Sequence, residues 1–151
     1  MKEFLNRGVL MNSFVVIGMG RFGQSVAKTL YQLGKDVLVI DQDEEVIQEI
    51  SEEVTHAVVG NATDEHVLKS LGIRNFDVAV VAIGVDIQSS ILVTVLLKEL
   101  GVKYVVAKAQ TELHAKVLNK VGADKVIFPE RDMGIRVARN LVSTNIPDLN
   151  N

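Results

Sequence analysis

The sequence of 151 residues predicts an α/β fold built on a parallel, doubly wound sheet. Short β-branched runs recur at regular intervals and do not alternate with polar residues, which is typical of strands covered on both faces. Segments with helical spacing separate these runs, so each strand leads into a helix. Four of the helical segments end in a glycine, where a left-handed residue terminates a helix: Gly34, Gly72, Gly101 and Gly122.

Six strands are expected along the chain. They are Phe14–Ile17, Val37–Ile40, Ala57–Val59, Val78–Ile83, Val102–Ala107 and Lys125–Phe128. The segments between them carry apolar residues at helical spacing, such as Val26, Leu30 and Leu33. Asp64, Asp86 and Thr111 stand where helix N-caps are expected.

One further helix is expected after Pro129. Its apolar residues fall largely on one side: Met133, Val137, Ala138, Leu141 and Val142. This helix either packs on its own domain or projects to another copy of the chain. A chain of this length forms one domain, which we divide into an N-terminal extension (1–12), a nucleotide-binding lobe (13–129) and a final helix with its tail (130–151).

Composition narrows the classes of function. Cysteine is absent, which excludes disulfides and thiolate metal sites and favours a cytoplasmic location. The net charge of −3 argues against a nucleic-acid partner, and no apolar run approaches the roughly 20 residues that span a bilayer. Seven carboxylates between Asp41 and Glu53 face no Lys or Arg, and we interpret them as a solvated helix face.

The stretch VVIGMGRFG, residues 15–23, predicts a nucleotide site. In this G-x-G-x-x-G pattern Gly18 turns the chain, Gly20 lets the backbone approach a phosphate, and Gly23 lets the helix pack on the strand. The helix N-terminus then directs N–H groups toward the anion. Asp41 ends the next strand and is placed to accept hydrogen bonds from both ribose hydroxyls, so the fold is expected to be Rossmann-like.

Arg21 departs from what a dinucleotide needs, because backbone N–H groups and a helix end largely neutralise a two-phosphate bridge. A guanidinium is better suited to the end of a chain of two or three phosphates. The alternative is a solvated residue of the first helical turn.

Other residues follow the strands at the same sheet edge. Asn61, Ala62 and Thr63 either border an adenine or form an ordinary capped loop, and Ala82, Ile83 and Gly84 follow the fourth strand. Lys108, after the fifth strand, either adds positive charge or is solvated. His56, His66 and His114 show no spacing for a metal or a nucleophile, and no P-loop is present, so no enzymatic activity is expected.

Several longer motifs carry a family resemblance. The chain contains the motifs GRFG, GNATDE, AKAQ and PERDMG. In a match that runs from about Ser13 to Ile146 and includes these motifs, it resembles the regulator-of-potassium-conductance (RCK, or TrkA-N) lobe of cytosolic subunits of bacterial Ktr and Trk potassium transporters. The pattern is most similar to the Ktr type. The resemblance implies a lobe that dimerises, assembles into an octameric ring beneath a membrane channel, and binds ATP and ADP in different ring shapes. Such subunits commonly continue into a smaller C-terminal lobe.

The resemblance also implies roles for individual residues. Gly18, Gly20, Arg21 and Phe22 would meet the phosphates, Asp41 the ribose, and Asn61 to Thr63 the base. Glu130 would reach the phosphates of the neighbouring subunit together with a divalent cation, and the last helix would cross between neighbours. The full set of expected contacts is Gly18, Met19, Gly20, Arg21, Phe22, Gly23, Asp41, Gln42, Asn61, Ala62, Thr63, Ala82, Ile83, Gly84, Lys108 and Glu130.

Two alternatives to an ATP/ADP sensor remain. An NAD(H)-sensing domain of the Trk type shares the fold and the acid at position 41 but has less use for Arg21. A small NAD-dependent oxidoreductase is disfavoured, because the sequence offers no substrate domain and no catalytic pair. A peripheral position at the inner face of the membrane is expected, through the channel partner.

Overall fold

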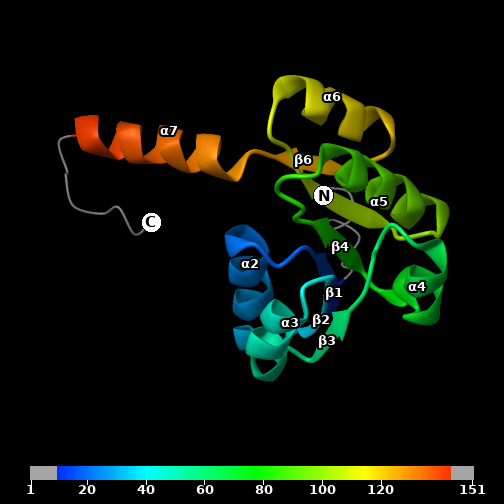
Figure 1. The fold of residues 1–151 in the computed structure, drawn as a ribbon. Helices are drawn as coiled ribbons and strands as arrows, with labels where there is room; N and C mark the ends of the chain where they lie inside the picture. Colours follow the sequence, from blue (N-terminus) through cyan, green and yellow to red (C-terminus); the bar gives the residue numbers. More distant parts are fainter. Residues whose placement is uncertain (1–9, 144–151) are drawn as a thin grey trace.

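A computed structural model describes residues 10–143 of the chain. Most of the expected N-terminal extension and tail therefore lie outside the described residues. The described part forms six parallel strands and the helices that connect them (Figure 1). The strands are β1 (Ser13–Ile17), β2 (Asp36–Asp41), β3 (His56–Val59), β4 (Val78–Val81), β5 (Tyr104–Lys108) and β6 (Lys125–Ile127).

The helices alternate with the strands as the sequence predicts. They are α2 (Arg21–Gln32), α3 (Glu44–Ile50), α4 (Glu65–Ser70), α5 (Ile87–Glu99), α6 (Glu112–Lys120) and α7 (Pro129–Val142), with single 3-10 turns η1 (Ser51–Glu53) and η2 (Ile73–Asn75). The expected N-caps are confirmed, since Asp64, Asp86 and Thr111 each accept hydrogen bonds from the first turn of their helix. Asp43 caps α3 in the same way and was not predicted.

The sheet has the strand order β3-β2-β1-β4-β5-β6. This order confirms the doubly wound, Rossmann-like fold, because the connections run one way from β1 to β3 and the other way from β4 to β6. The reversal lies between β1 and β4, which pair in register from Phe14↔Val78 to Ile17↔Val81. The loops that leave these two strands diverge at their carboxyl ends and open a crevice there.

Apolar side chains cover both faces of the sheet. On one face Val15, Ile17 and Ile40 pack with residues of α4, α5 and α6, and on the other Val16 and Val39 pack with residues of α2 and α3. Figure 1 shows the same division, with α2 and α3 on one side of the sheet and α4, α5 and α6 on the other. Continuous β-branched runs are needed for this arrangement, since each successive side chain enters a core.

Three strands are shorter than expected, for local reasons. β6 ends at Ile127 and not at Phe128, because Phe128 is the N-cap position of α7. β4 ends at Val81 and not at Ile83, because β1 turns away at Gly18 and the last bond to it is Ala82 N–H to Ile17 C=O at 2.8 Å. β5 begins at Tyr104 and not at Val102, because the Val102 N–H is used to end α5 at the Leu97 carbonyl.

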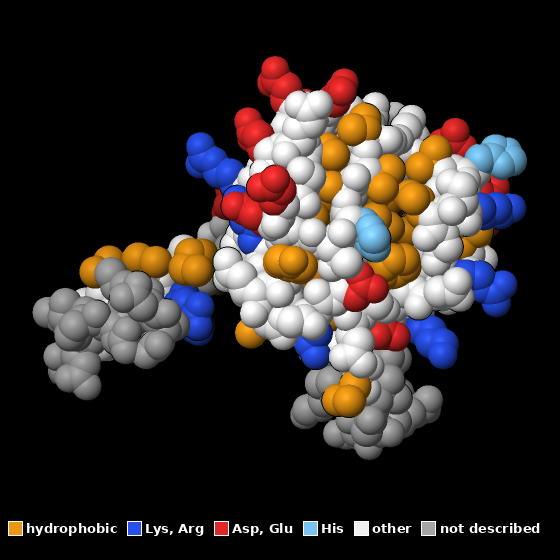
Figure 2. Space-filling view, turned by 90° about the horizontal axis from the view of Figure 1, so that it is seen from below, with side chains coloured by type: hydrophobic (Ala, Val, Ile, Leu, Met, Phe, Trp, Pro, Cys, Tyr) orange, Lys and Arg blue, Asp and Glu red, His pale blue; other side chains and the backbone are white. Residues whose placement is uncertain are grey.

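The last helix, α7, extends away from the sheet (Figure 1). It begins at Pro129, one residue before the boundary expected for it, and the structure buries none of its residues. Met133, Leu141 and Val142 are all more than half exposed. Hydrophobic side chains lie along this projecting arm in the space-filling view (Figure 2).

Candidate functional site

The glycine-rich loop between β1 and α2 forms the first wall of the site. Gly18 has a φ of +97°, and a Cβ there would lie 2.9 Å from the Ala82 carbonyl oxygen. A Cβ on Gly23 would collide with the Gly18 carbonyl oxygen, whereas one on Gly20 would meet nothing within 4 Å. Gly18 and Gly23 therefore allow close packing of strand, loop and helix, and Gly20 presents open backbone at the start of α2.

Asp41, at the end of β2, closes the second wall. Its Oδ2 accepts a hydrogen bond from the Met19 N–H at 2.7 Å, and its Oδ1 accepts one from the Asp43 N–H at 2.8 Å. The carboxylate thus fixes the glycine-rich loop against β2. Each oxygen retains capacity for one more donor, because a carboxylate offers about four acceptor positions.

The loop after β3 forms the third wall and is held by its own side chains. Asn61 Oδ1 accepts hydrogen bonds from the Thr63 N–H at 3.0 Å and from the Thr63 hydroxyl at 2.6 Å. The Gly60 N–H donates to the Asp41 carbonyl at 3.0 Å, which ties this loop to β2. The Asn61 side chain oxygen is therefore engaged within the loop, and its NH₂ group is the part left for a ligand.

The loop after β4 and the first turn of α5 form the fourth wall. Asp86 accepts hydrogen bonds from the Ser89 hydroxyl at 2.6 Å and from the Ser89 N–H at 3.0 Å. These bonds lower the pKa of the Asp86 carboxyl, so the group is ionised at neutral pH.

These four walls enclose a cleft of about 350 Å³ at the carboxyl edge of the sheet. It brings together most of the residues expected to bind nucleotide: Gly18, Met19, Gly20, Asp41, Gln42, Asn61, Ala62, Thr63, Ala82, Ile83 and Gly84. Asp86, Ser89 and Val93 also line the cleft and were not predicted. The reversal of strand order beside β4 is the signal that points to them, since α5 starts at the same crevice.

A second pocket, which we call the outer pocket, adjoins the cleft. It measures about 450 Å³ and is lined by Gly84, Lys108, Ala109, Gln110, Phe128, Pro129, Glu130 and Arg131. Gly84 belongs to both hollows, and the Lys108 Nζ lies 3.5 Å from the position of a Cβ on Gly84. The expected residues Lys108 and Glu130 are therefore neighbours of the cleft and not part of its lining.

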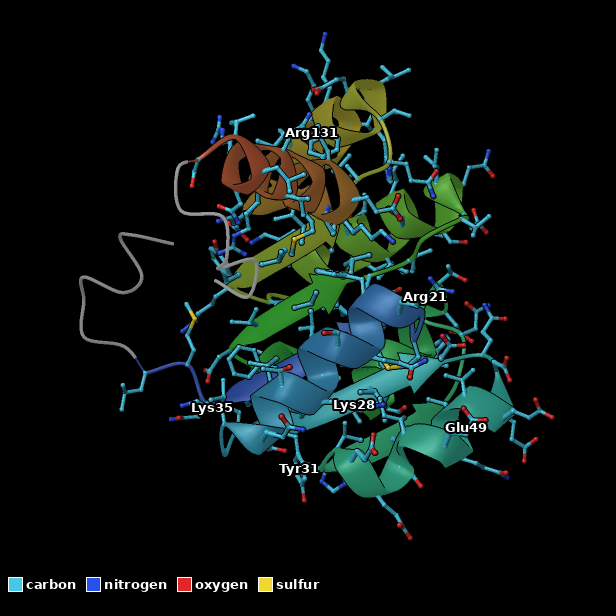
Figure 3. All side chains as sticks on the ribbon, turned by 90° about the vertical axis from the view of Figure 1, so that its left-hand side faces the viewer. Arg21, Lys28, Tyr31, Lys35, Glu49 and Arg131 are labelled. Atoms are coloured by element: carbon cyan, nitrogen blue, oxygen red, sulfur yellow. The ribbon has the colours of Figure 1, made fainter. Side chains whose placement is uncertain are left out.

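Three expected residues lie on α2 itself. Arg21 is the first residue of the helix, is exposed, and is not among the residues that line the cleft. Figure 3 shows it at one end of α2, with Lys35 just past the other end. Phe22 instead borders a groove between α2 and α7, together with Pro129 and Met133, and Gly23 is buried against Gly18.

The three histidines differ in their surroundings. His56 and His66 are exposed, whereas His114 is 3% exposed and contacts the Ser90 hydroxyl through Nε2 at 2.8 Å. No pattern in the sequence indicates this contact, because 24 residues separate the pair. His114 Nδ1 accepts a hydrogen bond from the Gln110 N–H at 3.1 Å, so the proton of the neutral ring is on Nε2, where it cannot take one from serine.

Comparison with known proteins identifies the family of this chain. The TrkA-N domain family matches residues 14–129. The chain belongs to this family. The TrkA-N chain is 52% identical over 139 residues to the Ktr system potassium uptake protein C of Bacillus subtilis, covering 92% of this chain and 63% of that protein. It is 50% identical over 133 residues to the Ktr system potassium uptake protein A of the same organism, covering 88% and 60%. The chain thus spans about three fifths of the length of these relatives.

Solved structures share the fold at lower identity. The TrkA-N domain of the inner membrane protein ybaL from Escherichia coli superposes with a TM-score of 0.77 at 19% identity, covering 89% of this chain and 98% of that one. The GsuK channel bound to NAD gives a TM-score of 0.71 at 17% identity, with 83% and 23% covered. GsuK bound to ADP gives 0.72 at 17% identity, with 89% and 35% covered.

No helix among residues 10–143 combines the length and the apolar character needed to cross a lipid bilayer.

Proposed function

We propose that this TrkA-N domain is a nucleotide-binding regulatory domain of a potassium uptake system, and that it senses adenine nucleotides without catalysing a reaction. The observation that carries the proposal is the cleft, where Asp41 and the glycine-rich loop meet at the reversal point of the sheet. The relatives of this chain that are named as potassium uptake proteins support the link to ion transport.

The ribose and base of the nucleotide would occupy the cleft itself. Asp41 keeps one free acceptor position on each carboxylate oxygen, which suits two neighbouring ribose hydroxyls. Asn61, Ala62 and Thr63 form the adjacent wall, which is rigid because Thr63 donates twice to Asn61. We therefore assign the base to this wall.

The phosphates would lie over the start of α2. The first turn of α2 holds no acidic side chain, and Gly20 leaves the backbone open there, so N–H groups are available to an anion. Arg21 at the first turn and Lys108 beside Gly84 stand at this end of the cleft and would attract additional phosphates. This distribution of charge favours ATP and ADP as the ligands.

A divalent cation would join through Glu130. Among residues 10–143 no three His, Cys, Asp or Glu side chains gather as a metal site, and the lining of the outer pocket offers one carboxylate, that of Glu130. That number suits Mg²⁺, which proteins commonly hold with one or two carboxylates while nucleotide phosphates and water complete its shell.

Regulation would act through association of copies of the chain. The exposed apolar residues of α7 fit a contact between neighbours in a dimer, and dimers would form the octameric ring beneath a membrane channel subunit. ATP and ADP would shift the ring between shapes by their difference in affinity for each shape, and by no more than that difference.

One observation favours a second candidate, an NAD(H)-sensing domain. Arg21 is exposed and does not line the cleft, so a dinucleotide that uses Asp41 and the glycine-rich loop needs nothing from it. NAD and ATP would share the ribose site and differ in what they require at the outer end.

Thermal unfolding of the purified chain with ATP, ADP, NADH and NAD⁺ tests the proposal. A bound ligand stabilises the folded state by RT ln(1 + [L]/Kd), or about 2.7 kcal/mol at 100 times Kd, so the shifts rank the affinities. We expect ATP and ADP to give the largest shifts. A larger shift with NADH would replace this assignment with the second candidate, and no shift with any nucleotide would reject both.

A further inference from the structure

His114 is a buried polar side chain at the junction of α5, α6 and the loop after β5. It is 3% exposed, and Ser90, its partner on α5, is fully buried. Its backbone N–H donates to the Thr111 hydroxyl at 3.1 Å, which caps α6. The ring therefore projects from the capped first turn of α6 and contacts α5 and the loop after β5.

The hydrogen bonds of the ring define its protonation state. The Gln110 N–H can only donate, so His114 Nδ1 must be an unprotonated acceptor at 3.1 Å. The neutral ring then carries its proton on Nε2 and donates it to the Ser90 hydroxyl at 2.8 Å. Both nitrogens are used, which fixes the orientation of the ring.

One partner lines the outer pocket, and the other is fully buried directly behind the cleft wall. Ser90 follows Ser89, which lines the nucleotide cleft and is held by Asp86. Gln110 lines the outer pocket with Lys108 and Glu130. His114 is thus a direct bridge from the first turn of α5 to the loop that walls the outer pocket.

We propose that His114 is a positioning residue for the phosphate end of the ligand. As the Nε2–H tautomer it holds Gln110, and the wall that carries Lys108, at a fixed place relative to the cleft. Phosphates that extend past Gly84 then meet a preformed wall. This inference rests on the proposed nucleotide-binding function and adds a residue that touches no ligand.

Two substitutions separate the two hydrogen bonds of the ring. Asn places its Oδ1 near the position of Nδ1, so His114→Asn retains the acceptor for the Gln110 N–H. Gln reaches toward the position of Nε2, so His114→Gln retains the contact with Ser90 and leaves the Gln110 N–H without its acceptor. Their comparison isolates the bond to the loop.

The experiment is titration calorimetry of both variants and the unmodified chain with ATP and with adenosine, which lacks the phosphate end. A single hydrogen bond corresponds to roughly a two- to tenfold change in affinity. We expect His114→Gln to weaken ATP by about that factor while adenosine changes less than about twofold. His114→Asn should keep ATP close to the unmodified value.

A second measurement uses no nucleotide. Hydrogen exchange at the Gln110 amide should be faster in His114→Gln than in the unmodified chain and nearly unchanged in His114→Asn, with thermal unfolding checking that each variant folds. If neither histidine variant folds, Ser90→Ala removes the other partner and should weaken ATP and spare adenosine.

Three results would overturn the proposal. They are an equal loss of ATP and adenosine affinity in His114→Gln, no change in either, and a nitrogen NMR spectrum showing the proton of His114 on Nδ1. If the unmodified chain binds no nucleotide, the proposed function fails and this inference fails with it. If it binds ATP and only the variants disagree, this inference alone fails.

Discussion

At the scale of single residues, Asp41 has a structural role in addition to the binding role that the sequence predicts for it. The spacing from the glycine-rich loop predicts a ribose ligand, and the structure adds that the same carboxylate accepts the Met19 N–H. Arg21 differs from Asp41. It lies beside the loop in the sequence, but its exposed side chain does not line the cleft. The two residues therefore give separate tests of the site.

Replacing Asp41 with Ala should weaken every adenosine nucleotide, ATP and NADH alike. Hydrogen bonds to a charged group contribute roughly 1.5–3 kcal/mol each, and the glycine-rich loop also loses its anchor. Titration calorimetry measures the loss. The control is Glu49→Ala, which removes an exposed acid from α3 (Figure 3). Affinities within twofold of the unmodified chain would mean that Asp41 is not a ligand.

Replacing Arg21 with Ala distinguishes the two candidate ligands. If the guanidinium reaches the outer phosphates, ATP should lose about 1.5–3 kcal/mol of binding free energy and NADH almost none. Lys28→Ala is the matched control, since it removes a cation from the same helix. The Lys28 ammonium pairs with the Glu53 carboxylate at 3.0 Å. Equal, small losses for both nucleotides would make Arg21 a solvated residue and favour the dinucleotide sensor.

At the scale of elements, the β1–α2 unit and α7 are both predicted from local sequence patterns, but they differ in their tertiary contacts. The glycine spacing of the loop is a local signal, yet the reason for each glycine lies in another segment: Ala82 for Gly18, and Gly18 for Gly23. For α7 the amphipathic pattern was visible in the sequence, and the structure leaves its apolar residues exposed. The glycine-rich unit is packed against its neighbours, whereas α7 has no buried residue among the described part of the chain.

The glycines of the loop should respond differently to a single methyl group. Gly23→Ala should lower the free energy of unfolding by about 1–3 kcal/mol, the usual cost of overpacking, because its Cβ meets the Gly18 carbonyl. Gly20→Ala should change stability by less than about 0.5 kcal/mol and still weaken nucleotides. Urea unfolding and calorimetry measure the two effects. A stable Gly23→Ala variant would contradict the packing argument.

The apolar residues of α7 should hold copies of the chain together. The double variant Met133→Asp and Leu141→Asp should lower the mass measured by light scattering with size exclusion, and it should not change the stability of the sheet, since both side chains are more than half exposed. Leu113→Asp is the control, as Leu113 is a comparably exposed residue of α6. An unchanged mass of the double variant would exclude α7 as the contact.

At the scale of the whole molecule, a few buried or bonded titratable groups set the response of stability to pH. Burial lowers the pKa of His114 below its ordinary value of 6.5. Burial raises the pKa of Asp77, but hydrogen bonds from the N–H groups of Asn12 and Ser13 and from the Ser13 hydroxyl outweigh it, so the pKa is lowered from 3.8. Both groups stabilise the folded state in their unprotonated form.

Acidification should therefore destabilise the domain in two steps. Below pH 6.5 the unfolded chain binds a proton at His114 that the folded chain resists, so the free energy of unfolding falls as the pH drops through this range. Asp77 adds a loss below pH 3.8. Urea unfolding at a series of pH values measures the slope. His114→Asn should flatten the first step, whereas the exposed His66→Asn should not.

The sequence alone predicts the alternation of strands and helices, the helix ends and the residues of the glycine-rich loop. These features depend on backbone conformation and on burial of both sheet faces, which neighbouring residues encode. It also placed Asp41, Asn61, Ala62 and Thr63 at one edge, because parallel strands bring their carboxyl ends together.

Which further residues join that edge depends on tertiary packing. Asp86 and Ser89 enter the cleft because β4 lies beside β1, and His114 meets Ser90 because α5 and α6 pack on one face of the sheet. Such contacts join residues far apart in the chain, so no local period or spacing encodes them. The separation of Arg21 and Lys108 from the cleft lining was decided in the same way, by where side chains point once the layers have packed.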